Sequence, residues 1–383
     1  MEYKLAVVLF ICYIVVAAGM TLFGPIVPKI REAYGLEYYQ VSYIIGVSFL
    51  GGFLSFLGGI VIPYIGYFKL ILVAIFLLCT GFATFPILVP SLLMYFSYFI
   101  IGLGSGFFET AVNPVIGKVY GEKKGMLLNL IHIGWNIGAF IGPSLIMLTS
   151  ILSLNFLYPY YIVALFLLVS VILLTTVKIN IDKVDVKETY SLRKILYERT
   201  LIMKFLLVSS VMFLYLGIEQ GINVWLPSLL YEYKAPNMLV EISVGLFWGA
   251  LGIGRLLWSP IVDKIGYRTT IMASSALSFF TMLLGLIDVN PNRSIVYWSA
   301  TGFILAPMFP TIYALCIETC KKHMGLFSGM LFSLGILGSF LLSILIGYVS
   351  TIRSVKESFY LILVLSLIII VALKTMSKGT IRK

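Results

Sequence analysis

Long apolar runs separated by short polar stretches follow one another along almost the whole chain of 383 residues. A helix needs about 20 mostly apolar residues to cross the hydrocarbon core of a bilayer. Runs of that length lie near residues 5–28, 41–62, 70–89, 92–119, 126–148, 157–177, 205–230, 242–262, 270–287, 295–317, 326–349 and 359–374. The pattern therefore predicts an all-α membrane protein with twelve transmembrane helices.

The two halves of the chain resemble each other. The glycine-containing stretch 59–69 after the second run resembles the stretch 259–268 after the eighth, and the fourth and tenth runs share a Gly…Pro spacing. A duplicated six-helix unit is typical of transporters whose substrate site lies between the repeats. We expect two six-helix pseudo-repeats, residues 1–177 and 205–383, joined by a cytoplasmic linker at 178–204.

Composition and charge support a membrane protein. Sixty per cent of the residues are hydrophobic and 11% are charged, against about 25% charged residues in soluble domains. With the N-terminus in the cytoplasm, twenty of the 27 Lys and Arg residues would lie on the cytoplasmic side, as the positive-inside rule requires. The net charge of +11 is thus a topology signal, and a nucleic-acid partner is not expected. We expect a monomer in the lipid of the plasma membrane, with both termini cytoplasmic.

The fourth run contains a carboxylate and an amide on one helix face. Glu109 and Asn113 are four residues apart, so they share that face. A charged side chain at the bilayer centre costs about 2.5–3.5 kcal/mol on insertion scales, and it marks a functional site by default. We predict that Asn113 binds substrate and that Glu109 can carry a proton; the alternative is a structural hydrogen bond between helices.

The fifth run has a polar face of its own. Asn129, His132 and Asn136 recur at helical spacing, with Trp135 beside them. Amides bind hydroxyl groups and aromatic faces cover C–H surfaces, so this set suits a hydroxyl-rich ligand. Hydrogen bonding between helices is the equally weighted alternative.

The seventh run carries the second acidic residue within a span. Glu219 lies four residues after Tyr215 and four before Asn223, and Gln220 is adjacent. We predict that Glu219, Gln220 and Asn223 contribute to substrate binding; a structural pair with a neighbouring helix is the alternative.

Arg255 is a basic residue inside the eighth run. It lies about 12 Å from the cytoplasmic end of its helix, and Glu109 lies about 13 Å from the end of its own. Because the depths are similar and the charges opposite, a Glu109–Arg255 pair, direct or through the substrate, is a hypothesis. A structural or gating role for Arg255 is at least as well supported.

Several function classes lack their residues. Cys316 and Cys320 share a helix face, but no second pair completes a metal site. The glycines at 102–106 follow no strand, so they indicate close helix packing and not a nucleotide loop. The sequence has no Walker loop and no catalytic set for an intramembrane enzyme. We therefore expect no metal, no cofactor, no enzymatic activity and no direct ATP drive.

The stretches between the second and third spans of each half resemble the loop motif of the major facilitator superfamily. The second copy has Asp263, Gly266 and Arg268; the first has Gly59, Gly66 and Lys69, with Pro63 in the expected Asp position. The resemblance extends over nearly the whole chain. It implies that these residues have a gating or structural role at the cytoplasmic side.

Within this superfamily, residues 108–114 are similar to the fourth helix of the fucose/glucose–proton symporter group, and Gly254-Arg255 resembles a helix-eight pattern of the same group. There the residue that matches Glu109 is linked to proton coupling and sugar binding. That group also has an acidic residue late in its first helix, whereas residues 4–28 contain none here. The resemblance leaves coupling to protons open.

Together these observations predict a secondary active transporter that moves a small polar solute, a sugar, by alternating access, with proton coupling as an open question. A multidrug or amphiphile exporter of the same fold is the first alternative. A transport-inactive receptor is another, but the sequence shows no soluble output domain.

Overall fold

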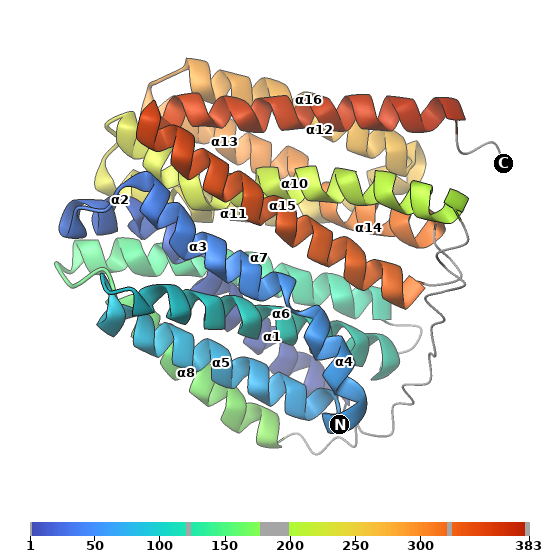
Figure 1. The fold of residues 1–383 in the computed structure, drawn as a ribbon, viewed down its shortest axis with the longest axis horizontal. Helices are drawn as coiled ribbons and strands as arrows, with labels where there is room; N and C mark the ends of the chain where they lie inside the picture. The colour runs from blue at the N-terminus through green and yellow to red at the C-terminus, as the bar shows by residue number, and fades with distance from the viewer. Residues whose placement is uncertain (1, 120–123, 177–198, 320–323, 380–383) are drawn as a thin grey trace.

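The computed structural model describes residues 2–119, 124–176, 199–319 and 324–379, and all regular elements in these ranges are helices (Figure 1). Before the linker the helices are α1 (Glu2–Met20), α2 (Phe23–Tyr34), α3 (Tyr38–Phe53), α4 (Phe56–Ile65), α5 (Tyr67–Leu88), α6 (Leu93–Val119), α7 (Lys124–Ile151) and α8 (Tyr158–Thr176). After it they are α10 (Arg199–Glu232), α11 (Asn237–Ile265), α12 (Tyr267–Ile287), α13 (Pro291–Leu305), α14 (Met308–Thr319), α15 (Met324–Ile352) and α16 (Val355–Gly379).

The expected all-α membrane architecture is confirmed. Eleven helices or continuous helix pairs in the described ranges are long and apolar enough to cross a membrane, and α3 with α4 makes a twelfth span that is bent by 44°. Two span boundaries differ from the prediction. The first span continues to Tyr34 through a turn at Thr21, and α10 begins at Arg199, inside the expected linker. The sequence at 191–197 would also allow a short helix on the membrane surface, and these residues lie outside the described ranges.

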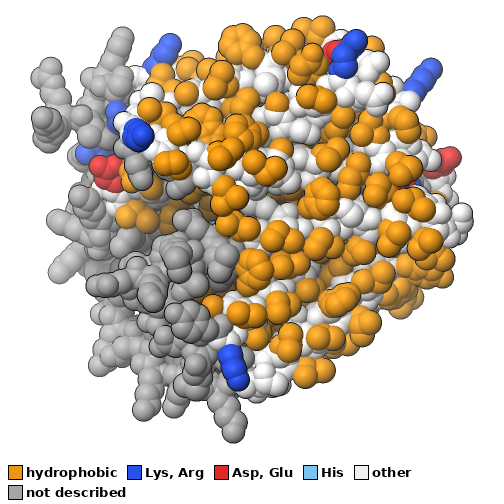
Figure 2. Space-filling view, turned by 180° about the vertical axis from the view of Figure 1, so that it is seen from behind, with side chains coloured by type: hydrophobic (Ala, Val, Ile, Leu, Met, Phe, Trp, Pro, Cys, Tyr) orange, Lys and Arg blue, Asp and Glu red, His pale blue; other side chains and the backbone are white. Residues whose placement is uncertain are grey.

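The outer surface carries apolar side chains over most of its area. Figure 2 shows them spread over the described part of one face, with charged side chains near its edges. Large side chains such as Phe76, Phe280 and Val371 are at least 60% exposed. Patches of this extent are not found on soluble monomers, so this surface suits contact with lipid.

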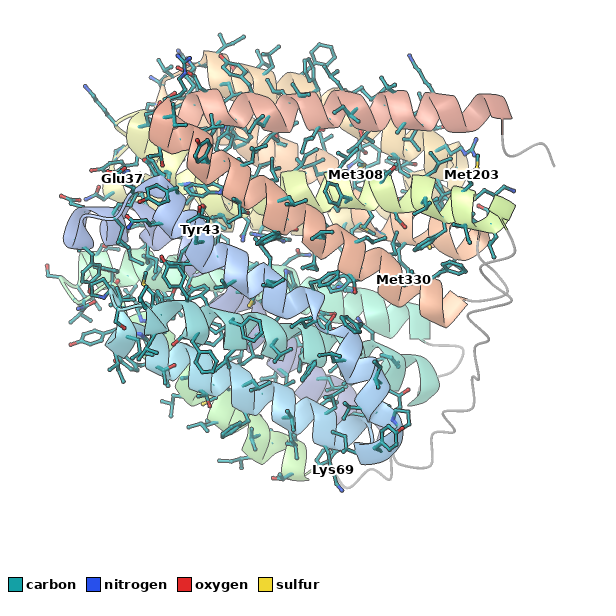
Figure 3. The ribbon with its side chains drawn as sticks, viewed as in Figure 1. Glu37, Tyr43, Lys69, Met203, Met308 and Met330 are labelled. Atoms are coloured by element: carbon teal, nitrogen blue, oxygen red, sulfur yellow. The ribbon has the colours of Figure 1, made fainter. Side chains whose placement is uncertain are left out.

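The two ends of the helices can be told apart by the connections they carry. We call the end with Thr176 and Arg199, next to the linker, the linker end, and the opposite end the distal end. In Figure 3, Lys69 and Met203 mark the linker end and Glu37 marks the distal end. The turns that join α2 to α3, α10 to α11 and α12 to α13 are all distal.

Helices α1–α8 lie on one side of the molecule and α10–α16 on the other (Figure 1). The two sets meet where α3 packs along α15, α7 along α11, and α2 against α10. We call this contact the seam. Near the distal end a side chain added at Gly24 would overlap the backbone oxygen of Asn223, and one at Gly347 would overlap Ser42. Farther from the distal end, a side chain added at Gly52 would lie 3.6 Å from the Ile336 side chain, which is an ordinary contact distance. The seam is therefore tightest at the distal end.

Gly66 and Gly266 adopt nearly the same backbone conformation, with φ 81° in both and ψ 162° and 157°. Each ends one helix and begins the next, and this region of φ and ψ is accessible essentially to glycine alone. The glycines singled out in the two loop motifs thus make the same turn in both halves.

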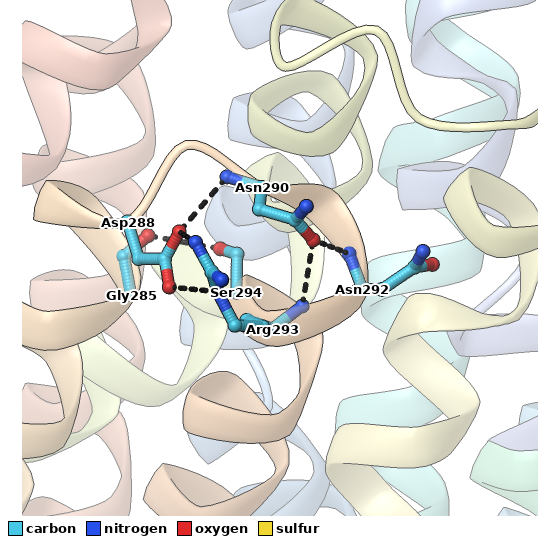
Figure 4. A network of polar contacts seen from close by, with 6 residues as sticks. All are labelled: Gly285, Asp288, Asn290, Asn292, Arg293 and Ser294. Carbon is cyan, nitrogen blue, oxygen red and sulfur yellow. Dashed lines mark hydrogen bonds and ion pairs between the residues drawn. The ribbon is translucent and has the colours of Figure 1, made fainter.

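A distal turn between α12 and α13 holds a compact polar network (Figure 4). Arg293 Nε and Nη2 donate to the two carboxylate oxygens of Asp288 at 2.6 and 3.0 Å, and the Asn290 side chain caps α13. The guanidinium of Arg293 holds the pKa of the Asp288 carboxyl below its ordinary value. This ion pair is exposed and stays within one half.

Gly102 lets α6 pack directly against α3, because a side chain there would collide with the backbone oxygen of Ser48. We expect Gly102→Ala to lower the free energy of unfolding by about 3 kcal/mol, the upper range for overpacking. The apparent unfolding temperature of detergent-solubilised protein measures this. Gly59→Ala is the matched control, since Gly59 has open space beside it within the described residues; equal effects at both positions would contradict close packing at Gly102.

Candidate functional site

A first polar cluster joins α1 and α6. The Tyr13 hydroxyl lies 3.0 Å from Glu109 Oε2 and 3.1 Å from Asn113 Oδ1, and Asn113 Nδ2 donates to Glu109 Oε2 at 2.9 Å. The expected shared face of Glu109 and Asn113 is confirmed. Tyr13 is fully buried and was not predicted, because a tyrosine in an apolar run counts as hydrophobic. Its hydroxyl, which needs a partner when buried, was the available signal.

Aromatic rings extend this first cluster towards α7 and α14. The Tyr13 ring centroid lies 6.2 Å from that of His132 and 6.4 Å from that of Trp135, both in edge-on arrangements. His132 in turn lies 6.2 Å from Phe309 of α14. The predicted residues His132 and Trp135 are thus brought to Glu109, and Phe309 adds a ring from the other half.

A second polar cluster lies on α10 and α11. Tyr215 donates a short hydrogen bond to Glu219, as their spacing on one helix face allows. Trp248 Nε1 donates to Asn223 Oδ1 at 2.8 Å, and Asn223 Nδ2 donates to Gln220 Oε1 at 3.2 Å. Glu219 is only 4% exposed. The three predicted residues of α10 therefore occupy one polar region, and Trp248 is a member that the sequence did not single out.

The seam brings these clusters towards each other at Asn136 and Arg255. Arg255 Nη1 donates to Asn136 Oδ1 at 3.5 Å, which is at the long limit for such a bond. Gly252, one turn from Arg255, packs against the Asn136 side chain. Arg255 of α11 therefore reaches across the seam to α7.

Two buried donors at this contact have no protein partner in the described structure: Asn136 Nδ2 and Arg255 Nε. Asn136 is only 4% exposed. An unpaired buried donor costs about 1–3 kcal/mol, so such groups are expected to meet a ligand or water. Hydroxyl oxygens are suitable acceptors for both.

A direct Glu109–Arg255 ion pair is not among those that the described residues form. Glu109 is held by Tyr13 and Asn113, and Arg255 contacts Asn136. The hypothesis of a pair through the substrate is untested by this geometry.

The remaining predicted residues lie at the periphery or outside the described part. The side chains of Asn129 and Asp263 are outside it. Lys69 is exposed at the linker end, and Arg268 Nη2 is buried without a partner among the described groups. The gating role of the loop motif therefore stays a prediction.

Metal chemistry has no support in the described ranges, where no group of three or more His, Cys, Asp or Glu side chains is placed to hold an ion. The arrangement instead offers amides, carboxylates, a guanidinium and aromatic rings.

Comparison with known proteins identifies the family. The model described as Major Facilitator Superfamily matches residues 9–234 and 208–379. The chain belongs to the major facilitator superfamily. Like other members, it is a membrane transporter and not an enzyme.

Curated relatives within this superfamily include sugar transporters. A Helicobacter pylori protein provisionally named a glucose/galactose transporter is 26% identical, covering 87% of this chain and 86% of its own. The glucose/mannose transporter GlcP of Bacillus subtilis is 22% identical, with 85% and 82% covered. The glucose/galactose transporter of Brucella abortus is 24% identical, with 80% and 78% covered.

Solved structures share the superfamily fold over the full length. The D-xylose–proton symporter aligns with a TM-score of 0.80 at 13% identity, covering 100% of this chain and 98% of its own. FucP in the outward conformation aligns with a TM-score of 0.68 at 19% identity, with 98% and 99% covered.

Proposed function

We propose that this protein is a secondary active transporter that carries a monosaccharide across the membrane by alternating access. The observation that carries the proposal is the contact of Asn136 with Arg255, where buried donors from both halves lack protein partners. Aromatic rings of Tyr13, Trp135 and Trp248 lie in the adjoining clusters. Amide, guanidinium and aromatic groups together suit a hydroxyl-rich ring.

The relatives support a sugar over an amphiphile. The curated proteins named above transport glucose, galactose or mannose according to their names, and the D-xylose transporter of the same fold is a proton symporter. A multidrug exporter is less favoured, because the polar clusters and the Asn136–Arg255 contact together hold two carboxylates and four amides.

The proposal includes the organisation of the chain. Residues 1–177 and 205–383 act as two halves that rock about the site, and residues 178–204 link them. The excess of Lys and Arg on the linker end supports a cytoplasmic linker and cytoplasmic termini in the plasma membrane. The protein works as a monomer, because the site is built within one chain. The tight distal seam then corresponds to a state closed to the outside.

Uptake into proteoliposomes tests the substrate class. We expect purified protein to accelerate the entry of labelled glucose, galactose or mannose, and unlabelled substrate to compete. The same panel is measured with and without a pH gradient. Absence of sugar flux together with efflux of cationic dyes would replace the sugar by an amphiphile, and sugar flux indifferent to the gradient would remove proton coupling.

A further inference from the structure

A buried ionic contact joins the two halves at the distal end of the seam. Lys29 Nζ of α2 lies 2.7 Å from Glu241 Oε1 of α11. Ser150 of α7 donates to the same carboxylate oxygen at 2.6 Å, and Lys29 Nζ lies 2.6 Å from Ser150 Oγ. Two of these side chains come from α1–α8 and one from α10–α16. We call the three residues the distal latch.

The latch differs from the other ion pairs that the described residues form. Arg31–Glu37 and Arg293–Asp288 each lie within one half, so only Lys29–Glu241 crosses the seam. The Glu241 side chain is 1% exposed and that of Lys29 is 26% exposed. Glu241 Oε2 is buried with no partner in the described structure. The carboxylate therefore depends on Lys29 and Ser150 to offset its lost hydration.

The position of the latch connects it to access from the distal side. Lys29 and Glu241 line a cavity of about 310 Å³, with Phe156 and Tyr231 in its wall. The nearby seam contacts are neutral: the Tyr39 backbone N–H donates to Thr351 Oγ1 at 3.0 Å, and Ser42 packs against Gly347. Glu32 lines the same cavity, but among the ion pairs of the described residues the latch is the one that joins the two halves.

We propose that Lys29, Ser150 and Glu241 are the gate of the distal side, which stabilises the closed state and must separate before substrate can enter or leave there. This rests on the alternating-access cycle proposed above. Removal of the Lys29 charge leaves the Glu241 carboxylate buried and unpaired, and removal of the Glu241 charge takes away the ionic contact across the seam. Both changes penalise the closed state more than the open one. Removal of both charges lifts that penalty. The two single changes should therefore open the distal side, and the double change should close it again.

Cysteine labelling measures this opening. Ser42 is fully buried in the seam, so Ser42→Cys reports the distal side, and Met330→Cys reports the linker end, where Met330 is 43% exposed. Both reporters are made in the full chain with its four native cysteines replaced by alanine. A membrane-impermeant maleimide is applied to vesicles of each orientation, so that the result does not depend on the assigned topology.

We expect Glu241→Gln and Lys29→Met each to raise the labelling rate of the Ser42→Cys reporter by about tenfold or more, within the usual range of conformational coupling. The double variant Lys29→Met/Glu241→Gln should return to within about threefold of the parent, since paired removal is close to neutral. Asp288→Asn is the matched control, because it breaks an exposed distal pair within one half. It should leave the rate unchanged.

Three results would overturn the gate. They are unchanged labelling in both single variants, a double variant at least as fast as the singles, and a rise at the Met330→Cys reporter as well, which would mean general unfolding. If the single variants fold poorly, Lys29→Arg and Glu241→Asp provide milder changes with the same expected direction. The labelling experiment contains no sugar. A failure to transport sugar in the uptake assay would therefore reject the proposed substrate class without affecting this test of the gate.

Discussion

The Glu109→Gln variant is expected to lose gradient-driven accumulation of sugar while it retains exchange of labelled for unlabelled sugar. Glutamine has the size of glutamate. Its side-chain oxygen can accept the hydrogen bonds that Glu109 Oε2 accepts from the Tyr13 hydroxyl at 3.0 Å and from Asn113 Nδ2 at 2.9 Å. It cannot take up a proton. Coupling to one proton makes a gradient of one pH unit worth about 1.4 kcal/mol, or about tenfold accumulation. In the variant, the concentration of sugar inside the vesicles should rise only to about that outside.

Proteoliposomes with an imposed pH gradient measure both quantities. Glu318→Gln is the matched control, because Glu318 is an exposed carboxylate near the linker end of α14, and it should accumulate sugar like the parent. Full accumulation by Glu109→Gln would take this carboxylate out of the coupling mechanism. Loss of exchange as well would instead make it a binding residue.

Arg255→Met is expected to destabilise the protein and to reduce sugar transport by at least about tenfold. The change removes the positive charge that acts on buried Glu219 and the bond to Asn136 across the seam. Arg255 and Glu219 do not form an ion pair among those of the described residues, so we expect a cost of about 1–3 kcal/mol, that of a buried polar group left without compensation. The double variant Arg255→Met/Glu219→Gln should recover a large part of the stability, because neither charge is then left alone.

Thermal unfolding in detergent and sugar uptake are measured for the single and double variants as a mutant cycle. Arg353→Gln is the control, since Arg353 is an exposed arginine at the distal end. If the losses of stability in the two single variants add up in the double variant, Arg255 does not stabilise the charge of Glu219. Recovery of stability without recovery of uptake would indicate that Arg255 also binds the substrate.

The span pattern was readable from the sequence because the bilayer imposes it. The backbone N–H and C=O groups of a segment in lipid must form hydrogen bonds within that segment, and about 20 residues are needed to span the bilayer. Each apolar run of this length is therefore expected to form a helix. The breaks at Thr21 and between Phe53 and Phe56 were not readable. A bend interrupts only a few backbone hydrogen bonds and leaves the apolar composition of the segment unchanged, so the apolar pattern does not reveal it.

Contacts within one helix were equally accessible to sequence reasoning. The pairs Glu109–Asn113 and Tyr215–Glu219 follow from a period of 3.6 residues, and the structure forms both. The sequence also singled out Glu109, Glu219 and Arg255 as ionisable residues inside apolar runs, where a charge is costly. These inferences need no knowledge of which helices are neighbours.

Only the tertiary structure decided which polar faces meet. Tyr13 reaches Glu109 across 96 residues of chain, and Arg255 reaches Asn136 across 119. The sequence analysis singled out neither Lys29 nor Glu241. Helices in lipid gain little from apolar burial against one another, so small residues and shape set their rotation and tilt. The sequence by itself therefore determined the helices and their polar positions. The packing at residues such as Gly24, Gly102 and Gly252 decided which of those positions form a site and which form a gate.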